Sequence, residues 1–337
     1  MGAKLYKQFN EFHDTIKLDK ESTPLKEKRE MLESDIKSKL PGELKKIDIS
    51  ITKSDLKFFD QGSYRQNTST GIKSGSVDRD LAIEFELDIN THDDPRKIKK
   101  CVRDALKIEN KREPKIKEPC VTVKYLKKGE ENVHIDFPIY AVCDGSYYLA
   151  RGKETSENKI WEECDPHGLN EHFDTLFQGD EGNQLRRIVR YLKKWREENY
   201  GSSYSKNQIP PSIGLTLLAG SVFSAKQTDG EDDDLKALLN VCNKIKDKFT
   251  KVDDDYEIEC LLPVLPNSDV FYKMTTSSKT TFYKKWEKLC EKVKNAADAT
   301  EEYEAAKFLQ SQFGNDFKLP PEPKANTGYA KRENNYA

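Results

Sequence analysis

Three aspartates in two short stretches of the sequence could bind metal ions. Asp78 and Asp80 lie in a segment, residues 77–87, in which apolar and acidic residues alternate as in a half-buried strand. Residues i and i+2 of a strand point to the same side, so both carboxylates face one spot, about 6.6–7 Å apart. Asp136 lies in a second predicted strand, residues 133–137, and can add a third carboxylate. Three oxygen ligands combined with substrate phosphates suit Mg²⁺.

A glycine turn precedes these acids. Gly62 and Ser63 follow an extended stretch and come before a predicted helical turn. Such a turn presents backbone N–H groups and a hydroxyl to a phosphate. Two Mg²⁺ ions about 3.5–4 Å apart would activate an attacking hydroxyl and neutralise a leaving pyrophosphate. The combination predicts nucleotidyl transfer, although an Asp-x-Asp pair taken alone is more often a solvated strand edge.

Two groups of elements must bring these residues together. Alternating patterns over residues 77–87, 120–125 and 133–137 predict a sheet. A helical spacing over residues 21–46, which stops at Pro41-Gly42, predicts a long N-terminal helix. Further helices are predicted over residues 95–106, 184–198, 212–225, 235–249 and 278–313, the last of them capped by Gly314.

These patterns predict an α+β fold with two lobes. A polar, glycine-containing stretch from about residue 144 to residue 159 is expected to be the loop that joins them. We expect a mixed-sheet lobe with the long N-terminal helix over residues 1–150 and a helical lobe over residues 151–319. The tail, residues 320–337, is poor in apolar residues and is expected to be flexible.

Composition and charge exclude several classes of protein. The 337 residues carry 57 Lys and Arg against 59 Asp and Glu, a net charge of -2, so no global field draws the chain to duplex nucleic acid or an anionic membrane. The longest apolar run, residues 213–225, is shorter than the ~20 residues of a membrane span. The N-terminus lacks the apolar region of a signal peptide, so we expect a cytoplasmic protein. Seven cysteines without a Cys-x-x-Cys predict reduced thiols and no disulfide framework.

The order of the motifs resembles that of a known family. The run Gln61-Gly62-Ser63, Asp78-Arg79-Asp80 and His134-Ile135-Asp136 is similar to the core of polymerase-β-like nucleotidyltransferases, in the bacterial cGAS/DncV-like form (CD-NTase, SMODS domain). The resemblance runs from about residue 59 to residue 319. Later segments that fit the family are residues 161–169, 186–195, 210–216 and 313–317. The resemblance implies a bilobal polymerase-β-like fold with a helical C-terminal lobe.

The family's catalytic residues can be carried over to matching positions. The resemblance implies that Gly62 and Ser63 hold the donor triphosphate. It also implies that Asp78, Asp80 and Asp136 bind two Mg²⁺ ions, for which Mn²⁺ can substitute. Asp136 would then ligate the metal near the nucleophile and accept its proton.

In such enzymes a helix lysine and a serine of the C-terminal lobe also touch the triphosphate. Lys193 and Ser212 match those positions best, and Arg190, one turn earlier on the same predicted helix, is the competing candidate. The spacer between Ser63 and Asp78 is longer than the usual form of the family, which affects the loop's expected substrate contacts but leaves the acids in register.

The implied product is a cyclic di- or trinucleotide, a second messenger of an anti-phage system of the CBASS type. NTPs are the expected substrates, and we expect neither membrane nor nucleic-acid binding. In this family a ubiquitin-transfer-like enzyme can conjugate the synthase through its C-terminus, here Ala337. The sequence does not indicate the bases, the linkage, the ring size, the activation or the oligomeric state.

Several alternatives compete with this interpretation. The same carboxylates would serve a linear oligonucleotide or tRNA-type transferase, and the chain could also be an NTP-binding regulator without turnover. Cys164-x-x-His167 has the spacing of one half of a zinc site, but no second pair repeats it. The cations over residues 186–194 could bind a nucleic-acid activator or be solvated, and we expect the Asp runs 232–234 and 253–255 to lie in solvated loops.

Overall fold

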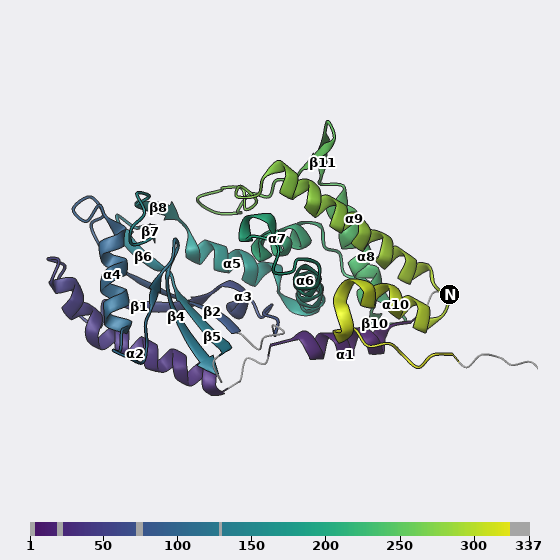
Figure 1. Cartoon of the computed structure of the whole chain (residues 1–337), viewed down its shortest axis with the longest axis horizontal. Helices are drawn as coiled ribbons and strands as arrows, with labels where there is room; N and C mark the ends of the chain where they lie inside the picture. Colours follow the sequence, from purple (N-terminus) through teal and green to yellow (C-terminus); the bar gives the residue numbers. More distant parts are fainter. Residues whose placement is uncertain (1–3, 19–22, 72–76, 128–129, 324–337) are drawn as a thin grey trace, which may run out of the picture.

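The computed structural model describes residues 4–18, 23–71, 77–127 and 130–323. Two lobes lie side by side, a sheet covered by helices and a group of helices (Figure 1). Each lobe has its own apolar cluster of buried residues. No helix in these ranges is long and apolar enough to cross a membrane. The predicted tail falls outside the described residues from residue 324 onward.

The described part of the first lobe contains one mixed sheet of eight strands. Its order is β3-β4-β5-β2-β6-β7-β8, and β1 pairs with the other side of β2. β5 and β6 are interrupted only by Pro138, and both run parallel to β2, while the remaining pairs are antiparallel. The strands are β1 (Lys57–Gln61), β2 (Val77–Glu86), β3 (Lys115–Ile116), β4 (Val121–Lys127), β5 (Glu130–Phe137), β6 (Ile139–Cys143), β7 (Ser146–Arg151) and β8 (Ile160–Cys164).

Two helices, α2 (Thr23–Lys45) and α4 (Pro95–Leu106), pack together over this sheet (Figure 1). The sequence predicted α4 with these bounds, and its first turn is capped by the Asp94 side chain, which accepts from the Arg96 N–H at 3.0 Å.

The predicted end of the long helix at Pro41-Gly42 is wrong, because α2 continues through Pro41 to Lys45. Proline inside a helix removes one hydrogen bond and crowds the preceding turn. Leu40 and Leu44 lie one turn apart on either side of it, and both are fully buried against the sheet. Burial of these two side chains offsets the cost of the proline.

A hairpin replaces the loop that was expected to start at residue 144. Asp144 and Gly145 both have positive φ, 50° and 80°, and connect β6 to β7 through a pair between Cys143 and Ser146. A two-residue turn of this kind matches the twist of antiparallel strands. The sheet therefore continues to the end of β8, although the lobe boundary at residue 150 remains a prediction.

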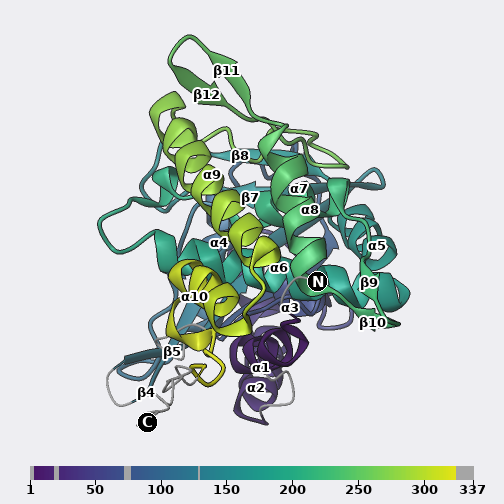
Figure 2. The same ribbon diagram turned by 90° about the vertical axis from the view of Figure 1, so that its right-hand side faces the viewer.

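The helical lobe combines the two ends of the chain. Phe12 of α1 lies 5.2 Å from the Tyr191 ring and 5.1 Å from the Phe317 ring, so α1 packs with helices more than 150 residues away in sequence (Figure 2). The helices are α1 (Tyr6–Ile16), α5 (Pro166–Leu176), α6 (Gly179–Asn199), α7 (Ser212–Val222), α8 (Asp234–Lys246), α9 (Thr276–Asp298) and α10 (Glu302–Phe313).

The two lobes also contain several short elements, and the last two helices differ from the predicted one. The helix expected over residues 278–313 is in fact two helices, α9 and α10, separated after Asp298. The predicted cap is confirmed, because Gly314 follows α10 with φ +75°. The remaining elements are the hairpins β9 (Gln227–Thr228) with β10 (Glu231–Asp232) and β11 (Thr250–Val252) with β12 (Asp255–Glu257), the 3-10 turns η1 (Lys206–Gln208) and η2 (Gly314–Asp316), and the four-residue α3 (Gly62–Arg65).

The continuation of α2 beyond Pro41 can be tested by substitution. Leu44→Ala should lower the free energy of unfolding by about 2–5 kcal/mol, because it leaves a cavity under the sheet. The matched control Lys45→Ala, at an exposed neighbour, should change it by no more than about 0.5 kcal/mol. Urea denaturation followed by circular dichroism measures both, and equal effects would contradict the packing of this last turn.

Candidate active site

The register of two parallel strands brings the three predicted carboxylates to one place. β2 and β5 pair so that Asp78 lies opposite His134 and Asp80 lies opposite Asp136. Paired residues of neighbouring strands project from the same face of a sheet. Asp78 is exposed, and Asp80 and Asp136 are partly buried beside it. The spatial grouping that the sequence predicted for these acids is thus present at this position of the sheet.

Each outer carboxylate has a partner of its own. Asp136 Oδ1 accepts a hydrogen bond from the Thr122 hydroxyl at 2.5 Å, and Lys117 Nζ lies 3.3 Å away from the same oxygen. Asp78 Oδ1 lies 3.1 Å from His134 Nδ1.

Asp80, the carboxylate between them, lies in an environment that disfavours its charged form. Burial and the negative charges of Asp136 and Asp78 raise the pKa of Asp80 to about 7. A divalent cation would relieve this repulsion, and carboxylate oxygens are the ligands that Mg²⁺ prefers. Within the described ranges no three His, Cys, Asp or Glu side chains already form a metal-binding group. The carboxylate oxygens suit Mg²⁺ by their chemistry and their common face, and substrate phosphates would have to complete the coordination.

The glycine turn lies directly against the acids. Gly62 has φ +67°, and a Cβ at this position would come 2.3 Å from Asp80 Oδ2, so only glycine fits. Asp60, two residues earlier, accepts two hydrogen bonds from Arg79, at 2.8 and 2.7 Å, which fixes the end of β1 to β2. Ser63 Oγ lies 3.0 Å from Ser69 Oγ. The turn that was predicted to bind phosphate and the acids that were predicted to bind metal are thus neighbours.

A pocket of about 290 Å³ between the lobes adjoins this turn. Ser63, Asp78, Lys193 and Ser212, which the sequence singled out, all line it. Gly62, Asp80, Asp136 and Arg190 are not among its lining residues. The sequence did not predict the rest of the lining: Ser69, Thr70, Arg196, Glu197, Tyr200 and Ile209. Arg196 and Tyr200 follow Lys193 at i+3 and i+7, and this helical spacing could have identified them.

Lys193 and Arg190 have different environments in α6. Lys193 Nζ donates to the carbonyl oxygen of Thr68 at 3.0 Å and to its hydroxyl at 2.9 Å. Burial, with the charges of Arg190 and Arg196, lowers the pKa of Lys193 to about 7. Arg190 donates to the carbonyl oxygen of Asn67, and burial lowers its pKa to about 10. Lys193 thus borders the pocket, whereas Arg190 supports the segment behind it.

The expectation that the first Asp run lies in a solvated loop is wrong, and two of the cations over residues 186–194 are paired with carboxylates. Arg187 donates to Asp232 and to the buried Asp234, each at 2.8 Å. The ammonium of Lys194, which is almost fully buried, lies 2.5 Å from Asp316. Asp233 caps α8 by accepting from the Lys236 N–H at 3.0 Å. These groups are held in intramolecular ion pairs and caps, so they are not available for a nucleic-acid backbone.

The residues of the zinc alternative are used differently. His167 Nε2 lies 2.7 Å from Glu84 Oε2, and burial raises the pKa of the Cys164 thiol to about 12. No third ligand completes a group with them in the part of the chain that the structure describes. In the structure His167 is thus bound to Glu84 of β2, and the Cys164 thiol donates to the carbonyl oxygen of Tyr147 at 3.6 Å.

The raised pKa of Asp80 predicts a pH dependence of stability. Since the folded-state pKa of about 7 exceeds the ordinary value of 3.8, the stabilisation from protonated Asp80 is complete below pH 4 and is lost as the pH rises through 7. The side chain of Asp80→Asn is neutral at every pH, so this variant keeps the stabilisation that the wild type loses. In EDTA at pH 8, the free energy of unfolding of this variant should exceed that of the wild type by about 2–4 kcal/mol. This difference should be smaller at pH 5.

Denaturation curves across this pH range, with Glu86→Gln at the exposed end of the same strand as control, measure the effect. Parallel profiles of the wild type and Asp80→Asn would contradict the raised pKa.

Comparisons with known proteins agree with this geometry. Residues 56–140 match the family model described as cyclic GMP-AMP synthase DncV-like, nucleotidyltransferase domain. A search of the curated proteins finds no match.

Solved structures share the fold at low sequence identity. The crystal structure of Vibrio cholerae DncV cyclic AMP-GMP synthase, a prokaryotic cGAS homolog, matches with a TM-score of 0.67 and 18% identity, over 92% of this chain and 96% of that one. The complex of the same enzyme with the linear intermediate 5′ pppA(3′,5′)pG matches with a TM-score of 0.67 and 17% identity, over 94% of this chain and 98% of that one. Escherichia coli DncV in its 3′-deoxy GTP bound form matches with a TM-score of 0.64 and 17% identity, over 92% of this chain and 97% of that one. Together with the family model, these likenesses identify residues 56–140 as a DncV-like nucleotidyltransferase domain within a chain that has the bilobal fold of DncV.

Proposed function

We propose that this nucleotidyltransferase joins NTPs, with Mg²⁺ as cofactor, into a cyclic di- or trinucleotide. The observation that carries the proposal is the pocket beside the paired strands, which gathers Ser63, Asp78, Lys193 and Ser212 from four separate segments of both lobes. Asp80 and Asp136 lie on the same face of the sheet as Asp78. DncV, the synthase whose fold this chain shares, has been captured with a linear pppApG intermediate, which supports the synthase-type reaction.

The proposed reaction is an in-line displacement. A ribose 2′- or 3′-hydroxyl of one NTP attacks the α-phosphorus of another, the new P–O bond forms, and the bond to the β-phosphate breaks with release of pyrophosphate. Bound Mg²⁺ would neutralise the phosphate charge and lower the pKa of the attacking hydroxyl. Asp78, Asp80 and Asp136 would hold the metal ions. Asp136 would also take the proton of the hydroxyl, and a second displacement within the linear product would close the ring.

The pocket supplies contacts for the donor triphosphate. Ser63 and Ser212 offer hydroxyls from the two sides, and the ammonium of Lys193 lies at the pocket wall. A positive group beside the β- and γ-phosphates stabilises both the bound triphosphate and the departing pyrophosphate. Gly62 lets the backbone approach this point closely, because its position has no room for a side chain.

The biological role is proposed from the family. A cyclic nucleotide made by this chain would act as second messenger of a CBASS-type anti-phage system in the cytoplasm, and a ubiquitin-transfer-like enzyme would conjugate the synthase at its C-terminus. A linear or tRNA-type transferase is the alternative product class, and an NTP-binding regulator the alternative without turnover.

The first test is product identity in the wild type and a double variant. Purified protein is incubated with all four NTPs and Mg²⁺ or Mn²⁺, treated with phosphatase, and the resistant products are identified by mass spectrometry. The wild type should give a phosphatase-resistant cyclic species. Asp78→Ala with Asp80→Ala should abolish it without loss of the fold, because Asp78 is exposed and the partly buried Asp80 is not part of the apolar core.

The control variant is Glu86→Ala, at the exposed end of the same strand. It should keep full activity. Synthesis by the double variant would contradict the metal-ligand assignment, and phosphatase-sensitive chains from the wild type would favour the linear transferase.

A second test concerns Lys193. Because its pKa in the free protein is about 7, the ammonium loses its proton as the pH rises to 9, and the affinity for a triphosphate should fall. Lys193→Met should weaken binding of a nonhydrolysable NTP by roughly 10- to 100-fold at pH 7, the loss of one charged hydrogen bond. Lys193→Arg stays charged and should bind without this pH dependence.

Isothermal titration calorimetry between pH 7 and 9 measures these affinities. Lys294→Met, on the exposed surface of α9, is the matched control. Equal affinities of the wild type and Lys193→Met across the range would remove Lys193 from the triphosphate site.

A further inference from the structure

Residues 66–71 connect the glycine turn to the pocket wall. Ser69 and Thr70 line the pocket, and Thr68 holds the side chain of Lys193. Asn67 has a positive φ of 54°, so the backbone turns sharply at this point. The conformation of this segment therefore determines where two pocket residues lie. It is held from two directions, and neither set of contacts is local in sequence.

The first set comes from one face of α6. Arg186 Nε donates to the carbonyl oxygen of Gln66 at 3.2 Å, Arg190 donates to that of Asn67, and Lys193 donates to that of Thr68 at 3.0 Å. The three cations are spaced at i, i+4 and i+7, which places them on one helical face. Three successive carbonyl groups are thus bound by three cations on one face of α6.

The second set comes from the end of α1. The Gly71 N–H donates to the carbonyl oxygen of Ile16 at 2.9 Å, and the Leu18 N–H donates to that of Ser69 at 3.3 Å. Lys17 and Thr70 form an isolated antiparallel bridge between these bonds. The segment that lines the pocket is therefore paired, backbone to backbone, with residues 16–18.

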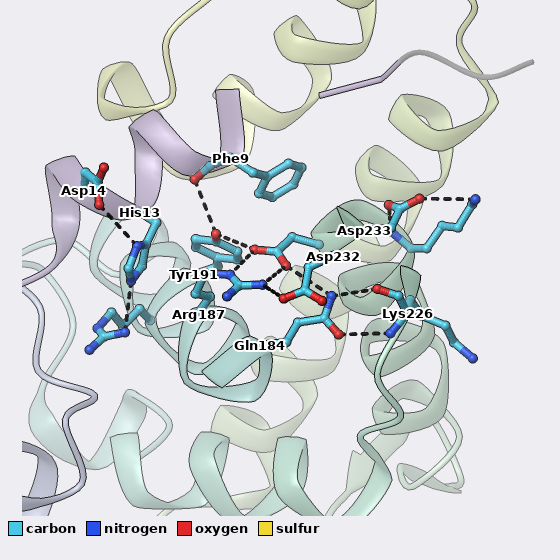
Figure 3. Close-up of polar contacts among 12 residues, drawn as sticks. Phe9, His13, Asp14, Gln184, Arg187, Tyr191, Lys226, Asp232 and Asp233 are labelled. Atoms are coloured by element: carbon cyan, nitrogen blue, oxygen red, sulfur yellow. Dashed lines mark hydrogen bonds and ion pairs between the residues drawn. The ribbon is translucent and has the colours of Figure 1, made fainter. Parts of the chain in front are cut away.

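His13 of α1 contacts Arg190 of the first set, and Figure 3 shows His13 with Asp14 on the helix that also carries Phe9. Its Nε2 lies 3.0 Å from Nη1 of Arg190, and its Nδ1 lies 3.5 Å from Asp14. Burial and the charge of Arg190 lower the pKa of His13 to about 4, so the ring is neutral at pH 7 and Nε2 can accept from the guanidinium. Behind this contact, the Tyr191 hydroxyl of α6 donates to Asp234 at 2.8 Å and lies 3.4 Å from the carbonyl oxygen of Phe9.

The partners of Arg190 point to a role beyond stability. The guanidinium is nearly fully buried, its Nε has no hydrogen-bond partner, and its two bonds go to a carbonyl group and a neutral ring. Its neighbour Arg187 is neutralised by two carboxylates, whereas no ion pair between Arg190 and a carboxylate occurs in the described ranges. A buried charge without a counterion costs stability. The arrangement keeps positive charge behind the segment that borders the pocket.

We propose that α1 is a strap for the nucleotide pocket and that Arg190, clasped by His13, is the positioning residue through which it acts. The strap fixes residues 66–71, so that Ser69, Thr70 and the Lys193 ammonium are preorganised for the triphosphate. The inference rests on the proposed function for its effect on NTP binding, but the strap itself is a property of the folded chain. Arg190 acts through the Asn67 carbonyl group and does not touch the nucleotide.

The experiment combines hydrogen exchange with NTP affinity in four variants. Arg190→Gln removes the positive charge, and Arg190→Lys keeps the charge with fewer hydrogen-bond donors. His13→Ala removes the contact between the imidazole and the Arg190 guanidinium. The control, Lys7→Ala, changes the exposed outer face of α1. Amide exchange is followed by mass spectrometry over residues 66–71, and the Kd of a nonhydrolysable NTP with Mg²⁺ is measured by calorimetry.

Arg190→Gln should speed exchange over residues 66–71 and raise the Kd about tenfold, the loss of one charged hydrogen bond. His13→Ala should raise the Kd by about threefold, since it removes one acceptor of Arg190 but leaves the bond to the Asn67 carbonyl group in place. Arg190→Lys should recover part of the affinity, and Lys7→Ala should match the wild type. A purely structural role would lower the melting temperature and leave the Kd of the folded protein unchanged.

Unchanged exchange and unchanged Kd in a folded Arg190→Gln variant would overturn the proposal. If that variant does not fold, His13→Ala decides by the same two measurements. If the wild type binds no NTP, the proposed function fails, and hydrogen exchange over residues 66–71 alone decides whether the strap exists.

Discussion

Repulsion between carboxylates is the constraint around which the site is arranged. The parallel register of β2 and β5 places Asp80 beside Asp136, and Asp78 is one pleat away on the same face. Burial first, and then the like charges of Asp136 and Asp78, raise the pKa of Asp80, so this grouping costs free energy. Lys117 offsets part of the charge of Asp136 directly. Arg190 and Lys193 of α6, which have no carboxylate ion pair among the described residues, bind the segment that follows the glycine turn. A metal-bound triphosphate at the proposed site would complement this separation of negative and positive charge.

The two lobes meet at the glycine turn and the segment after it. From α5, Asn170 donates to the carbonyl oxygen of Asp60 at 3.4 Å, and Asp174 accepts from Arg65 at 2.5 Å. α6 holds the next residues through its cations, and α1 pairs with the last of them. The turn is thus part of the sheet lobe by sequence and of the helical lobe by contact. A nucleotide in the pocket would touch both lobes at the place where they already hold each other.

The sequence predicted what depends on local pattern and missed what depends on distant partners. The alternation of apolar and acidic residues predicted β2 and its Asp-x-Asp pair, and the helical pattern that begins at Pro95 predicted α4. Both depend on periodicity and capping, which can be recognised within a few residues. The hairpin after β6 was missed although Asp-Gly is a hairpin signal, since Gly145, Gly152 and the polar residues up to 159 were interpreted as one loop. The burial of the α6 cations was missed because their partners lie at residues 66–68, 232–234 and 316, which no local pattern connects to α6.

The position of α1 has a consequence for how the chain folds. Phe12 contacts Phe313 and Phe317, so the whole sheet lobe is inserted between the first helix of the helical lobe and the rest of it. During synthesis α1 leaves the ribosome before the sheet lobe, whereas Phe313 and Phe317, which bury it, are made after the sheet lobe. Contacts of such long sequence separation form slowly, because a large loop must close before they contribute. The sheet lobe can therefore fold as a unit first, and completion of the helical core waits for the final helix.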